Sequence, residues 1–470
     1  MTLFTLRDAA LQIPGAIVIG DENIMFDRVS TDSRTAGPGD LFIAIKGDRF
    51  DAHNFLPQVA QRGIAAVLVT RTPDDFQVPA IKVKDTREAL GALAHGWRKR
   101  FTIPLIAVTG SNGKTTVKEM IASILAAAVG ESARLATAGN FNNDIGLPLT
   151  LFRLNETHKL AVVELGMNHP GETETLGKIA APTVAVVNNA QREHQEFMAT
   201  VEAVALEHAS VIHALANNGT AVFPADDKYA SIWRVAATGN PILDFALHTD
   251  ASQTPAAVTG KLVGATLKIN TPQGALEVAL QVLGEHNARN ALTATAAAIA
   301  ANVSLDAVKR GLEAFQPVKG RLQVKRAALK PIEGATVIDD TYNSNPDSMR
   351  AAIDVLASQP SPRVLVMGDM GEVGDQGPAF HREVGTYAAE RGIDALYALG
   401  DASMDSAKVF GTAAQHFTDI TSLIAALTGA GFGPDATFLV KGSRFMQMER
   451  VVDAVTSPHQ PAAGVMPAAH

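Results

Sequence analysis

Cysteine is absent from the 470 residues of this sequence. Disulfide bonds and thiol catalysis are therefore excluded, and a chain without cysteine fits a reducing compartment. Basic residues are not in excess either, because 40 Lys and Arg stand against 48 Asp and Glu and give a formal net charge of -8. Scattered basic residues make no electrostatic footprint for nucleic acid, so a nucleic-acid partner is not expected.

Long uncharged apolar runs are also missing. None approaches the ~20 residues that a membrane-spanning helix needs. The first residues, MTLFTLRDAALQIPG, include Asp8 and lack the charged region and apolar core of a signal peptide. These absences predict a soluble cytoplasmic protein that does not insert into a membrane.

The sequence does have enough apolar residues for several cores. It is 47% hydrophobic and 19% charged, and its length suggests about three domains. Apolar runs that alternate with helix-like or turn-rich segments predict an α/β fold for each domain. The expected parts are a small N-terminal α/β domain (1–102), a central phosphate-loop domain with a parallel sheet (103–319), a Rossmann-like C-terminal domain (320–456) and a disordered tail (457–470).

Residues 105–119 read LIAVTGSNGKTTVKE, an apolar strand that breaks into glycines before helix formers resume. Such a turn aims backbone N–H groups and the positive end of a helix at one point, which suits a phosphate. Lys114 adds a charge, and the Thr115 hydroxyl can bind Mg²⁺. The general pattern G-x-x-x-x-G-K-[ST] is not satisfied, because Val108 stands where its first glycine belongs. A chance glycine-lysine turn is the alternative, and a phosphate loop alone does not choose between hydrolase, kinase and ligase.

Polar residues follow two further strand-like runs of the central domain. LAVVE ends on Glu164, and His194 comes shortly after TVAVVNN. The carboxyl ends of strands in wound sheets face the ligand crevice, so Glu164 could hold Mg²⁺ beside Thr115 and His194 could be a second ligand. The alternatives are an exposed strand-end glutamate and a surface or core histidine. The asparagines of GNFNNDIGLP favour turns and could also contact a polar ligand.

Two segments of the C-terminal domain carry charges near predicted strand ends. VIDDTYNSNPDSM ends a strand with Asp339 and Asp340, where carboxylates commonly bind ribose hydroxyls or a metal. Asn345 or Asp347 could instead cap the helix that follows. VKGSR places Lys441 and Arg444 around a turn, which is either a second anion site or a solvated basic turn.

Taken in order, these segments resemble the Mur ligase family. STDSRTAGPGDLFIAIKGDRFDAHNF (30–55) resembles its uridine-nucleotide-binding segment, and TGSNGKTT resembles its shortened phosphate loop. NFNNDIGLP, VELGMN, GEHNARNALTATA, GRLQ, DDTYNSNPDSM and VKGSR follow with family-like order and spacing. The resemblance covers essentially residues 1–456, and several motifs in order are far more specific than any one of them.

The resemblance implies an ADP-forming ligase of peptidoglycan precursor synthesis, a process that supports cell shape and division. Mg-ATP would phosphorylate the terminal carboxylate of UDP-N-acetylmuramoyl-tripeptide, and the amine of D-alanyl-D-alanine would then attack the acyl phosphate. The expected cofactors are ATP and two Mg²⁺ ions. The protein is expected to be a monomer whose domains close before chemistry, because its sites come from different domains.

The resemblance also assigns roles to individual residues. Lys114, Glu164 and His194 are the expected catalytic residues, with Thr115, Glu164 and His194 holding Mg²⁺. ATP is expected between the central and C-terminal domains, in contact with Gly110, Ser111, Asn112, Gly113, Lys114, Thr115, Thr116, Asn287 and Asn290 (adenine), Arg321 (phosphates) and Asp340 (ribose). The substrates are expected at Ser33, Arg34, Lys46 and Gly47 (uridine nucleotide), Asn140, Asn142, Asn143 and Asp144 (substrate loop), and Lys441 and Arg444 (dipeptide).

One departure from the family pattern concerns the second metal. Several members have a carbamylated lysine that bridges the metals, and counting from His194 brings that position to His208. No lysine occurs between Lys178 and Lys228. The hypothesis is that Glu207 or His208 binds the second Mg²⁺ or orders its waters, and the alternative is that both lie on a helix surface.

Three rival functions remain open. A Mur ligase that adds a single amino acid and a folylpolyglutamate synthetase are the nearest, although the 30–55 segment argues against the folate enzyme and DDTYNSNP with VKGSR favours dipeptide addition. The third rival is a phosphate-loop hydrolase or switch protein, which would release phosphate without an amine acceptor. The sequence does not tell whether the third residue of the tripeptide is diaminopimelate or lysine.

Overall fold

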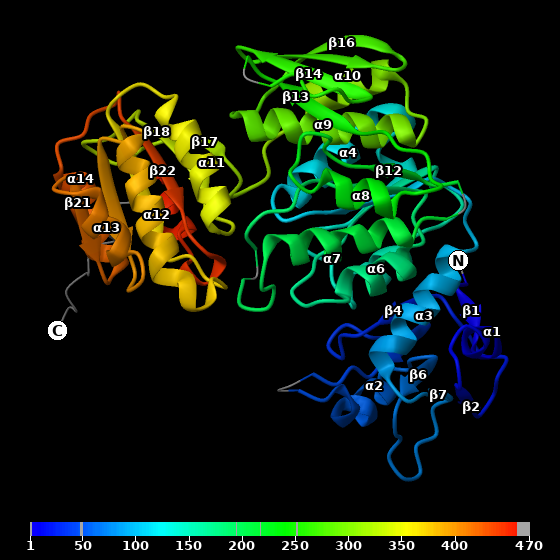
Figure 1. Ribbon diagram of the computed structural model, residues 1–470. Helices are drawn as coiled ribbons and strands as arrows, with labels where there is room; N and C mark the ends of the chain where they lie inside the picture. Colours follow the sequence, from blue (N-terminus) through cyan, green and yellow to red (C-terminus); the bar gives the residue numbers. More distant parts are fainter. Residues whose placement is uncertain (1, 48–49, 194, 217, 251, 458–470) are drawn as a thin grey trace, which may run out of the picture.

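The computed structural model describes residues 2–47, 50–193, 195–216, 218–250 and 252–457. Three α/β bodies follow one another along the chain (Figure 1), an N-terminal one in blue, a central one in cyan to green and a C-terminal one in yellow to red. The three-domain α/β fold predicted from the sequence is thereby confirmed. The predicted disordered tail, 457–470, lies outside the described residues except for Ser457.

The N-terminal body is built on a sheet in the order β2-β7-β6-β5-β4, with β2 antiparallel and the other neighbours parallel. Strands β5 and β6 are buried along their whole length, as expected for a sheet covered on both faces. Its elements are β1 (Phe4–Thr5), α1 (Leu6–Leu11), β2 (Ile17–Ile19), β3 (Met25–Phe26), β4 (Arg28–Ser30), β5 (Asp40–Ile43), α2 (Leu56–Gln61), β6 (Ala66–Val69), β7 (Ala80–Lys82) and α3 (Thr86–Arg98).

Helix α3 attaches this body to the central one. Asp85 caps it by accepting the backbone N–H groups of Arg87 and Glu88, and the helix packs on α5 and α6 of the central body. The indole of Trp97, at its buried end, donates to the Leu154 carbonyl at 3.1 Å.

The central body contains a parallel sheet in the order β12-β11-β8-β10-β9. Helices α4, α9 and α10 pack together on one side, and α6 packs with α7 on the other. Its elements are β8 (Leu105–Thr109), α4 (Lys114–Val129), β9 (Arg134–Ala136), α5 (Gly146–Leu151), β10 (Leu160–Glu164), α6 (Glu172–Ala180), β11 (Val184–Val187), α7 (Val201–His213), β12 (Thr220–Val222), α8 (Ala230–Ala236), β13 (Phe245–His248), β14 (Val258–Val263), β15 (Thr266–Thr271), β16 (Gly274–Ala279), α9 (Glu285–Ala300) and α10 (Leu305–Ala314).

A second sheet of the central body, β13-β14-β15-β16, was not predicted. Strands β14, β15 and β16 form an antiparallel meander at the top of Figure 1. Inward Leu267 and Ile269 alternate along β15 with exposed or half-exposed polar residues. Such short alternating strands carry a weaker sequence signal than the continuous apolar runs of a parallel sheet.

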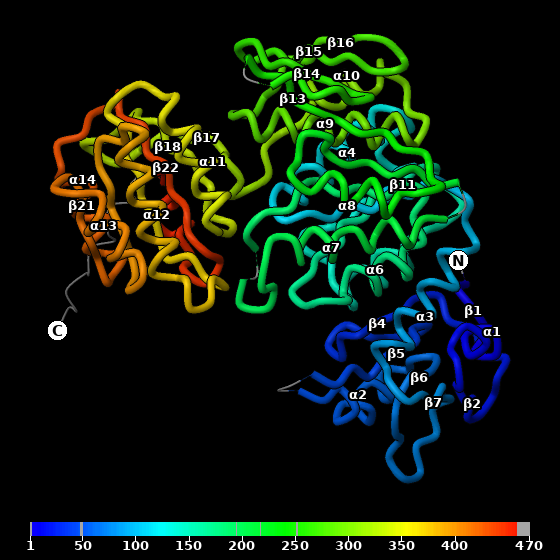
Figure 2. The backbone as a smooth tube through the Cα atoms, viewed as in Figure 1, coloured from blue at the N-terminus to red at the C-terminus, as the bar shows by residue number. Residues whose placement is uncertain are grey.

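The C-terminal body has the sheet order β17-β18-β22-β19-β20-β21, parallel except for the edge strand β17. Figure 2 follows the chain from the central body into this sheet, whose last strand, β22, lies inside the sheet beside β18 and β19. Its elements are β17 (Gln323–Arg326), β18 (Thr336–Asp340), α11 (Pro346–Ala357), β19 (Arg363–Gly368), α12 (Gly377–Glu390), β20 (Ala395–Leu399), α13 (Met404–Phe410), β21 (Ala414–Phe417), α14 (Ile420–Gly429), β22 (Thr437–Lys441) and α15 (Glu449–Thr456).

Among the described residues, no helix is long and apolar enough to cross a membrane.

Candidate active site

The phosphate loop lies where the strand order of the central sheet reverses. Strand β8 has β10 on one side and β11 on the other, and in register Glu164 stands beside Val108 while Val187 stands beside Thr109. A crevice forms at the carboxyl ends of the strands at such a switch point. The topology therefore brings the loop, Glu164 and the residues that follow β11 to one place.

The backbone of the loop is fixed by the asparagines after β11. The Ser111 N–H donates to the Asn189 carbonyl at 3.2 Å, and the Asn112 N–H donates to Asn189 Oδ1 at 2.9 Å. Gly113 has φ +79°, and a Cβ there would lie 2.6 Å from Asn290 Oδ1. Both the left-handed backbone and the close approach require glycine at this position.

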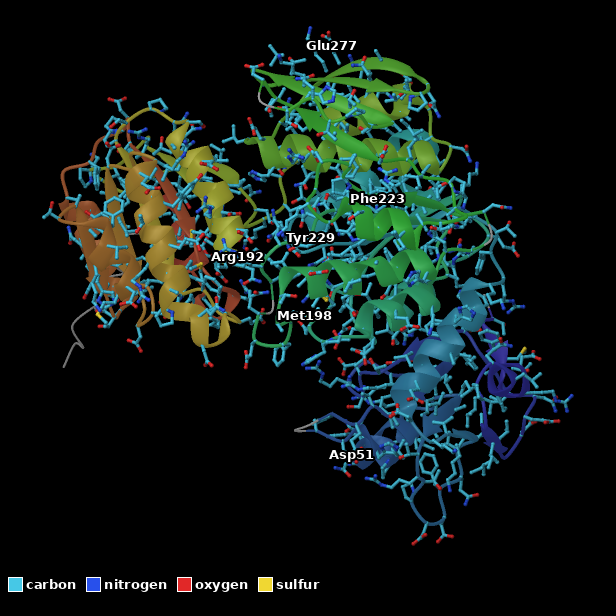
Figure 3. All side chains as sticks on the ribbon, in the orientation of Figure 1. Asp51, Arg192, Met198, Phe223, Tyr229 and Glu277 are labelled. Atoms are coloured by element: carbon cyan, nitrogen blue, oxygen red, sulfur yellow. The ribbon has the colours of Figure 1, made fainter. Side chains whose placement is uncertain are left out.

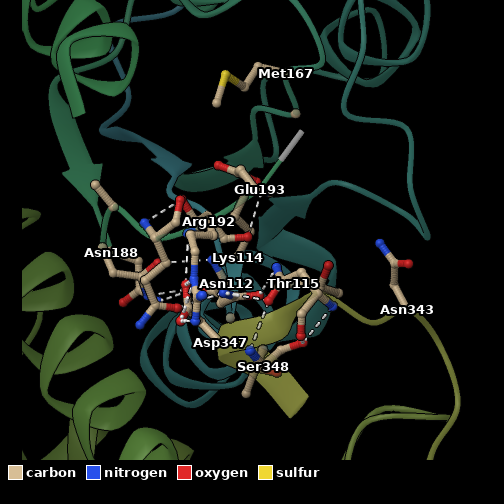
Figure 4. A pocket seen from close by; sticks show the side chains of 18 of the residues that line it. Asn112, Lys114, Thr115, Met167, Asn188, Arg192, Glu193, Asn343, Asp347 and Ser348 are labelled. Atoms are coloured by element: carbon tan, nitrogen blue, oxygen red, sulfur yellow. Dashed lines mark hydrogen bonds and ion pairs between the residues drawn. The ribbon is translucent and has the colours of Figure 1, made fainter. Parts of the chain in front are cut away.

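Lys114 begins α4 and lies over its own loop. Its Nζ donates to the Gly110 carbonyl at 2.5 Å and to the Ser111 carbonyl at 3.2 Å, and it pairs with Glu193 Oε2 at 3.1 Å. The ammonium group is thus held beside the turn where the outer phosphates of a nucleotide would lie (Figure 4).

Glu164 and Thr115 form the part of the site that suits a divalent cation. The Thr115 hydroxyl donates to Glu164 Oε1 at 3.2 Å and accepts from Arg321 Nη2 at 2.9 Å, while Asn142 Nδ2 donates to the same Oε1 at 2.8 Å. Glu164 is buried, and its Oε2 has no hydrogen-bond partner among the described residues. A buried, unpartnered carboxylate oxygen beside a hydroxyl fits Mg²⁺, which takes oxygen ligands and keeps several waters.

His194, the second predicted metal ligand, lies outside the described residues. Within the described residues, no group of three or more Asp, Glu or His side chains could hold a metal. A Mg²⁺ site made of one carboxylate, one hydroxyl and several waters does not need three such side chains.

A cleft of about 1640 Å³ joins these residues to parts of all three bodies. Of the predicted residues, it is lined by Ser111, Asn112, Gly113, Lys114, Thr115, Thr116, Asn140, Asn142, Asn143, Asp144, Glu164, Asn287, Asn290, Arg321, Asp340, Lys441 and Arg444. From the N-terminal body Arg87 reaches it, and its Nη1 pairs with Asp144 Oδ2 at 2.9 Å. The described residues that line the cleft do not include Gly110 or the predicted uridine-site residues Ser33, Arg34, Lys46 and Gly47.

The predicted uridine residues lie within the N-terminal body. The Arg34 guanidinium pairs with Asp32 Oδ2 at 2.7 Å, and this hydrogen bond lowers the pKa of Asp32 to about 2. Lys46 and Asp51 form an isolated antiparallel β-bridge through their backbones. Gly47 donates its N–H to the Phe50 carbonyl at 2.8 Å.

Two residues predicted for different ligands contact each other. Lys441 Nζ pairs with Asp340 Oδ2 at 2.7 Å and donates to the Asn343 carbonyl at 2.8 Å. Asp340 was assigned to the ribose and Lys441 to the dipeptide, so the ligands of these two residues would have to lie close together. Arg444 pairs instead with Glu449 at 2.8 Å.

The asparagines predicted for the adenine form a chain against the loop. Asn290 Nδ2 donates to Asn287 Oδ1, and Asn188 Nδ2 donates to Asn290 Oδ1, both at 3.0 Å. Arg321 places its guanidinium 4.1 Å from the centre of the Tyr342 ring. Asn188 Nδ2 also donates to the Asn112 carbonyl at 2.8 Å, so Asn290 is linked to the backbone of the phosphate loop through Asn188.

The residues after β11 were missed as site residues. Asn188, Asn189, Gln191, Arg192 and Glu193 all line the cleft. The signal was present in TVAVVNN, since polar residues that follow a buried parallel strand lie at the crevice. The prediction took only His194 from this segment.

The alternative metal ligands named in the sequence analysis have other partners here. Glu207 accepts the N–H groups of Gly171 at 2.9 Å and Thr173 at 2.8 Å, at the start of α6. His208 is completely buried and contacts Thr109 and Glu193 with its two ring nitrogens. Neither residue lies on a helix surface, and their role in holding a metal stays a prediction.

Known proteins match this chain over nearly its whole length. Three family models match, described as Mur ligase family, catalytic domain (residues 26–98), Mur ligase middle domain (108–298) and Mur ligase, glutamate ligase domain (320–444). The UDP-N-acetylmuramoyl-tripeptide--D-alanyl-D-alanine ligase of Haemophilus influenzae is 40% identical to this chain, over 94% of this chain and 96% of the relative. The ligase of the same name from Escherichia coli is also 40% identical, over 92% of this chain and 94% of the relative.

Solved structures of Mur ligases also match this chain over nearly its whole length. A crystal structure of MurF from Acinetobacter baumannii superimposes with a TM-score of 0.87 at 35% identity, over 97% of this chain and 99% of that one. MurF ligase from Thermotoga maritima in complex with ADP has a TM-score of 0.79 at 25% identity, over 91% and 96%. The chain belongs to the Mur ligase family.

Proposed function

We propose that this protein is an ATP-dependent ligase that adds D-alanyl-D-alanine to UDP-N-acetylmuramoyl-tripeptide, in the synthesis of peptidoglycan precursors. The relatives named above carry this activity in their names, and 94% of this chain aligns with the first of them. The observation that supports the proposal in this chain is the cleft, where the phosphate loop and Glu164 of the central body face Asp340 and Lys441 of the C-terminal body. A reaction that brings a nucleotide, a peptide carboxylate and an amine together needs such a site between domains.

The chemistry has two steps. The terminal carboxylate of the tripeptide attacks the γ-phosphorus of ATP, and ADP leaves. The amine of D-alanyl-D-alanine then attacks the acyl carbon, a tetrahedral intermediate forms, and inorganic phosphate leaves with the former carboxylate oxygen. Phosphate is a far better leaving group than oxide, so the first step makes the second one possible.

The residues of this chain position the reactants and neutralise their charge. The N–H groups at the start of α4 and the ammonium of Lys114 would face the phosphate oxygens, once Lys114 has turned from its present partners. Arg321, which holds the Thr115 hydroxyl at 2.9 Å, adds a second positive charge from the C-terminal side. Glu164, Thr115 and His194 would hold Mg²⁺, which would supply further neutralisation of the phosphate charge.

The same proposal covers the setting of the reaction. The three predicted domain ranges, 1–102, 103–319 and 320–456, are the proposed folding and binding units. Because the proposed reaction uses ATP and a UDP-linked substrate, we propose a cytoplasmic enzyme, and we expect a monomer in solution.

Phosphate release tests the function. The full chain is incubated with Mg-ATP, the tripeptide and the dipeptide, and each substrate is omitted in turn. Release that requires both substrates, with a pentapeptide product of the expected mass, supports the proposal. Release that ignores them indicates a hydrolase, and release with a single amino acid in place of the dipeptide indicates a different ligase. Parallel reactions with diaminopimelate- and lysine-containing tripeptides identify the third residue.

A further inference from the structure

Glu193 is a buried carboxylate of the cleft that the sequence analysis did not assign. Its Oε1 lies 2.9 Å from His208 Nε2, and its Oε2 lies 3.1 Å from Lys114 Nζ. Its side chain is only 6% exposed. A carboxylate in such a place needs positive or hydrogen-bonding partners at both oxygens, because an unpaired buried charge is costly.

His208 fixes the position of this carboxylate from inside the central body. It lies on α7, is 0% exposed, and its Nδ1 is 3.0 Å from the hydroxyl of Thr109, the last residue of β8. With the proton on Nε2, the ring donates to Glu193 and accepts from the Thr109 hydroxyl, so that all three groups are satisfied. His208 acts on the cleft only through Glu193, which makes it a positioning residue.

These contacts connect the two ends of the phosphate loop. Thr109 directly precedes Gly110, and Lys114 ends the loop, so the series Thr109, His208, Glu193, Lys114 closes a ring of contacts around it. In Figure 4, Glu193 and Lys114 are drawn joined by a dashed line. The three N–H donors of Lys114 are used by the Gly110 carbonyl, the Ser111 carbonyl and Glu193, so Lys114 must give up at least one of these contacts to bind a phosphoryl oxygen.

We propose that Glu193 is a metal-binding carboxylate of the nucleotide-loaded enzyme, held in place by His208. In the described structure it pairs with Lys114. When Mg-ATP draws Lys114 to the phosphates, Glu193 Oε2 loses that cation at the edge of the phosphate site, and a second Mg²⁺ takes its place directly or through a bound water. The proposal rests on the Mg-ATP chemistry of the proposed function. In this chain His208 stands at the position of the family's carbamylated lysine. On this proposal the neighbouring Glu193 supplies the carboxylate that the modified lysine would otherwise provide.

Counting bound Mn²⁺ tests this without turnover. The purified full chain is titrated with Mn²⁺ in the presence of a non-hydrolysable ATP analogue, and free Mn²⁺ is measured by electron paramagnetic resonance. In Glu193→Gln, the affinity for the second ion should fall by about 10–100-fold, while the first ion is retained. Glu196→Gln is the matched control, because it makes the same charge change at an exposed position three residues away, and it should bind both ions like the wild type.

Nucleotide binding without metal separates a functional role from a structural one. Glu193→Gln should bind the metal-free analogue at least as tightly as the wild type, since a negative charge beside the phosphates is gone and Lys114 is released. A merely structural glutamate would weaken metal-free and metal-loaded binding together and lower the melting temperature. That result, or wild-type affinity for the second ion in Glu193→Gln, would overturn the proposal.

The positioning role of His208 is tested by rescue. His208→Leu should weaken the second ion like Glu193→Gln does, whereas His208→Gln keeps an N–H donor near the Nε2 position and should restore most of the affinity. Equal affinities in the two variants would exclude the proposed role. If the variants fail to fold, anomalous scattering from Mn²⁺ in wild-type crystals with ADP decides whether an ion lies beside Glu193. None of these readouts uses the tripeptide or the dipeptide. The proposal for Glu193 can therefore be wrong while the ligase function is correct, and the ligase function can be wrong while Glu193 binds a metal.

Discussion

At the scale of single residues, the cleft contains oppositely charged side chains that are close together and largely buried. Lys114 is the clearest case, because three acceptors hold its ammonium group. In the proposed reaction, neither a neutral side chain of similar length nor the loop backbone could replace its charge in the transition state. Electrostatic groups of this kind typically contribute the largest single part of a rate enhancement.

Lys114→Met should therefore lower kcat by about 10²–10³-fold, with a much smaller effect on nucleotide binding. Steady-state phosphate release and analogue titration measure the two quantities. Lys178→Met, an equal change at an exposed ion pair on α6, serves as the control and should keep wild-type kcat. A Lys114→Met enzyme with kcat within a few-fold of the wild type would contradict the assigned role.

Patterns of neighbouring residues made part of this site predictable. The phosphate loop and Glu164 stand at the ends of continuous apolar strands, and all of them except Gly110 line the cleft. Asp340 and Lys441 were each predicted, but their contact joins residues 101 positions apart and depends on β18 and β22 being neighbours. The pairing of Glu193 with His208 joins a loop to a helix, and no local pattern encodes it.

At the scale of helices and strands, the elements around the site support one another through their ends. Helix α6 is preceded by Gly171 at its N-cap position, and glycine provides no side-chain cap. Glu207 of α7 supplies the cap from outside, by accepting the N–H groups of Gly171 and Thr173. A carboxylate at the positive end of a helix is favourable both as an acceptor and through the helix dipole.

Glu207→Gln should lower the free energy of unfolding by about 1.5–3 kcal/mol, the usual range for a hydrogen bond to a charged group. Urea denaturation followed by circular dichroism measures this loss. The Mg²⁺ dependence of the ligation rate should not change if the carboxylate is a helix cap. A changed Mg²⁺ dependence with unchanged stability would favour the alternative prediction, that Glu207 helps to hold the second metal.

Continuous apolar strands were the predictable elements of the fold. Strands β8, β10 and β11 are buried throughout, and their sequences are nearly continuous apolar runs. The meander from β14 to β16 was missed because only one of its faces is covered. Alternation over such short segments is easily lost among turn residues.

At the scale of the whole molecule, a group of polar contacts joins the central and C-terminal bodies beside the phosphate loop. Arg192 lies where these bodies face each other (Figure 3) and pairs with Asp347 at 2.5 Å and Glu383 at 2.7 Å. Asn345 Nδ2 donates to Asn112 Oδ1 at 2.9 Å, inside the loop itself. The arrangement of the two bodies is therefore coupled to the phosphate loop, which is the proposed nucleotide site.

Arg192→Met should shift the molecule towards more open forms, because Asp347 and Glu383 lose the arginine that joins them to the central body. We expect closure to weaken by about 1.5–3 kcal/mol, seen as a larger radius of gyration in small-angle X-ray scattering and a higher KM for ATP. Arg382→Met, which breaks an ion pair within the C-terminal body, is the matched control and should leave both unchanged. An unaltered radius of gyration in Arg192→Met would show that other contacts determine the closed form.

The same contacts predict how closure depends on pH. The hydrogen bond from Arg192 is the main cause of a lowered pKa of Glu383, with further lowering from Arg350. A lowered pKa means that the contribution is complete above the usual glutamate value of about 4.3 and is lost as the pH falls through the lower value in the closed form. Scattering profiles should therefore be constant from neutral pH to about pH 5 and expand only in stronger acid, whereas expansion near neutral pH would contradict this.

The central claim is that a peptide carboxylate is activated by transfer of the γ-phosphoryl group and then captured by an amine. Its most direct test is a single turnover with tripeptide labelled with ¹⁸O in the terminal carboxylate, followed by mass spectrometry of the phosphate. An acyl-phosphate route predicts that each inorganic phosphate released carries an ¹⁸O atom from the peptide. Unlabelled phosphate from the labelled peptide, with solvent oxygen in its place, would show that ATP is simply hydrolysed and would contradict the account.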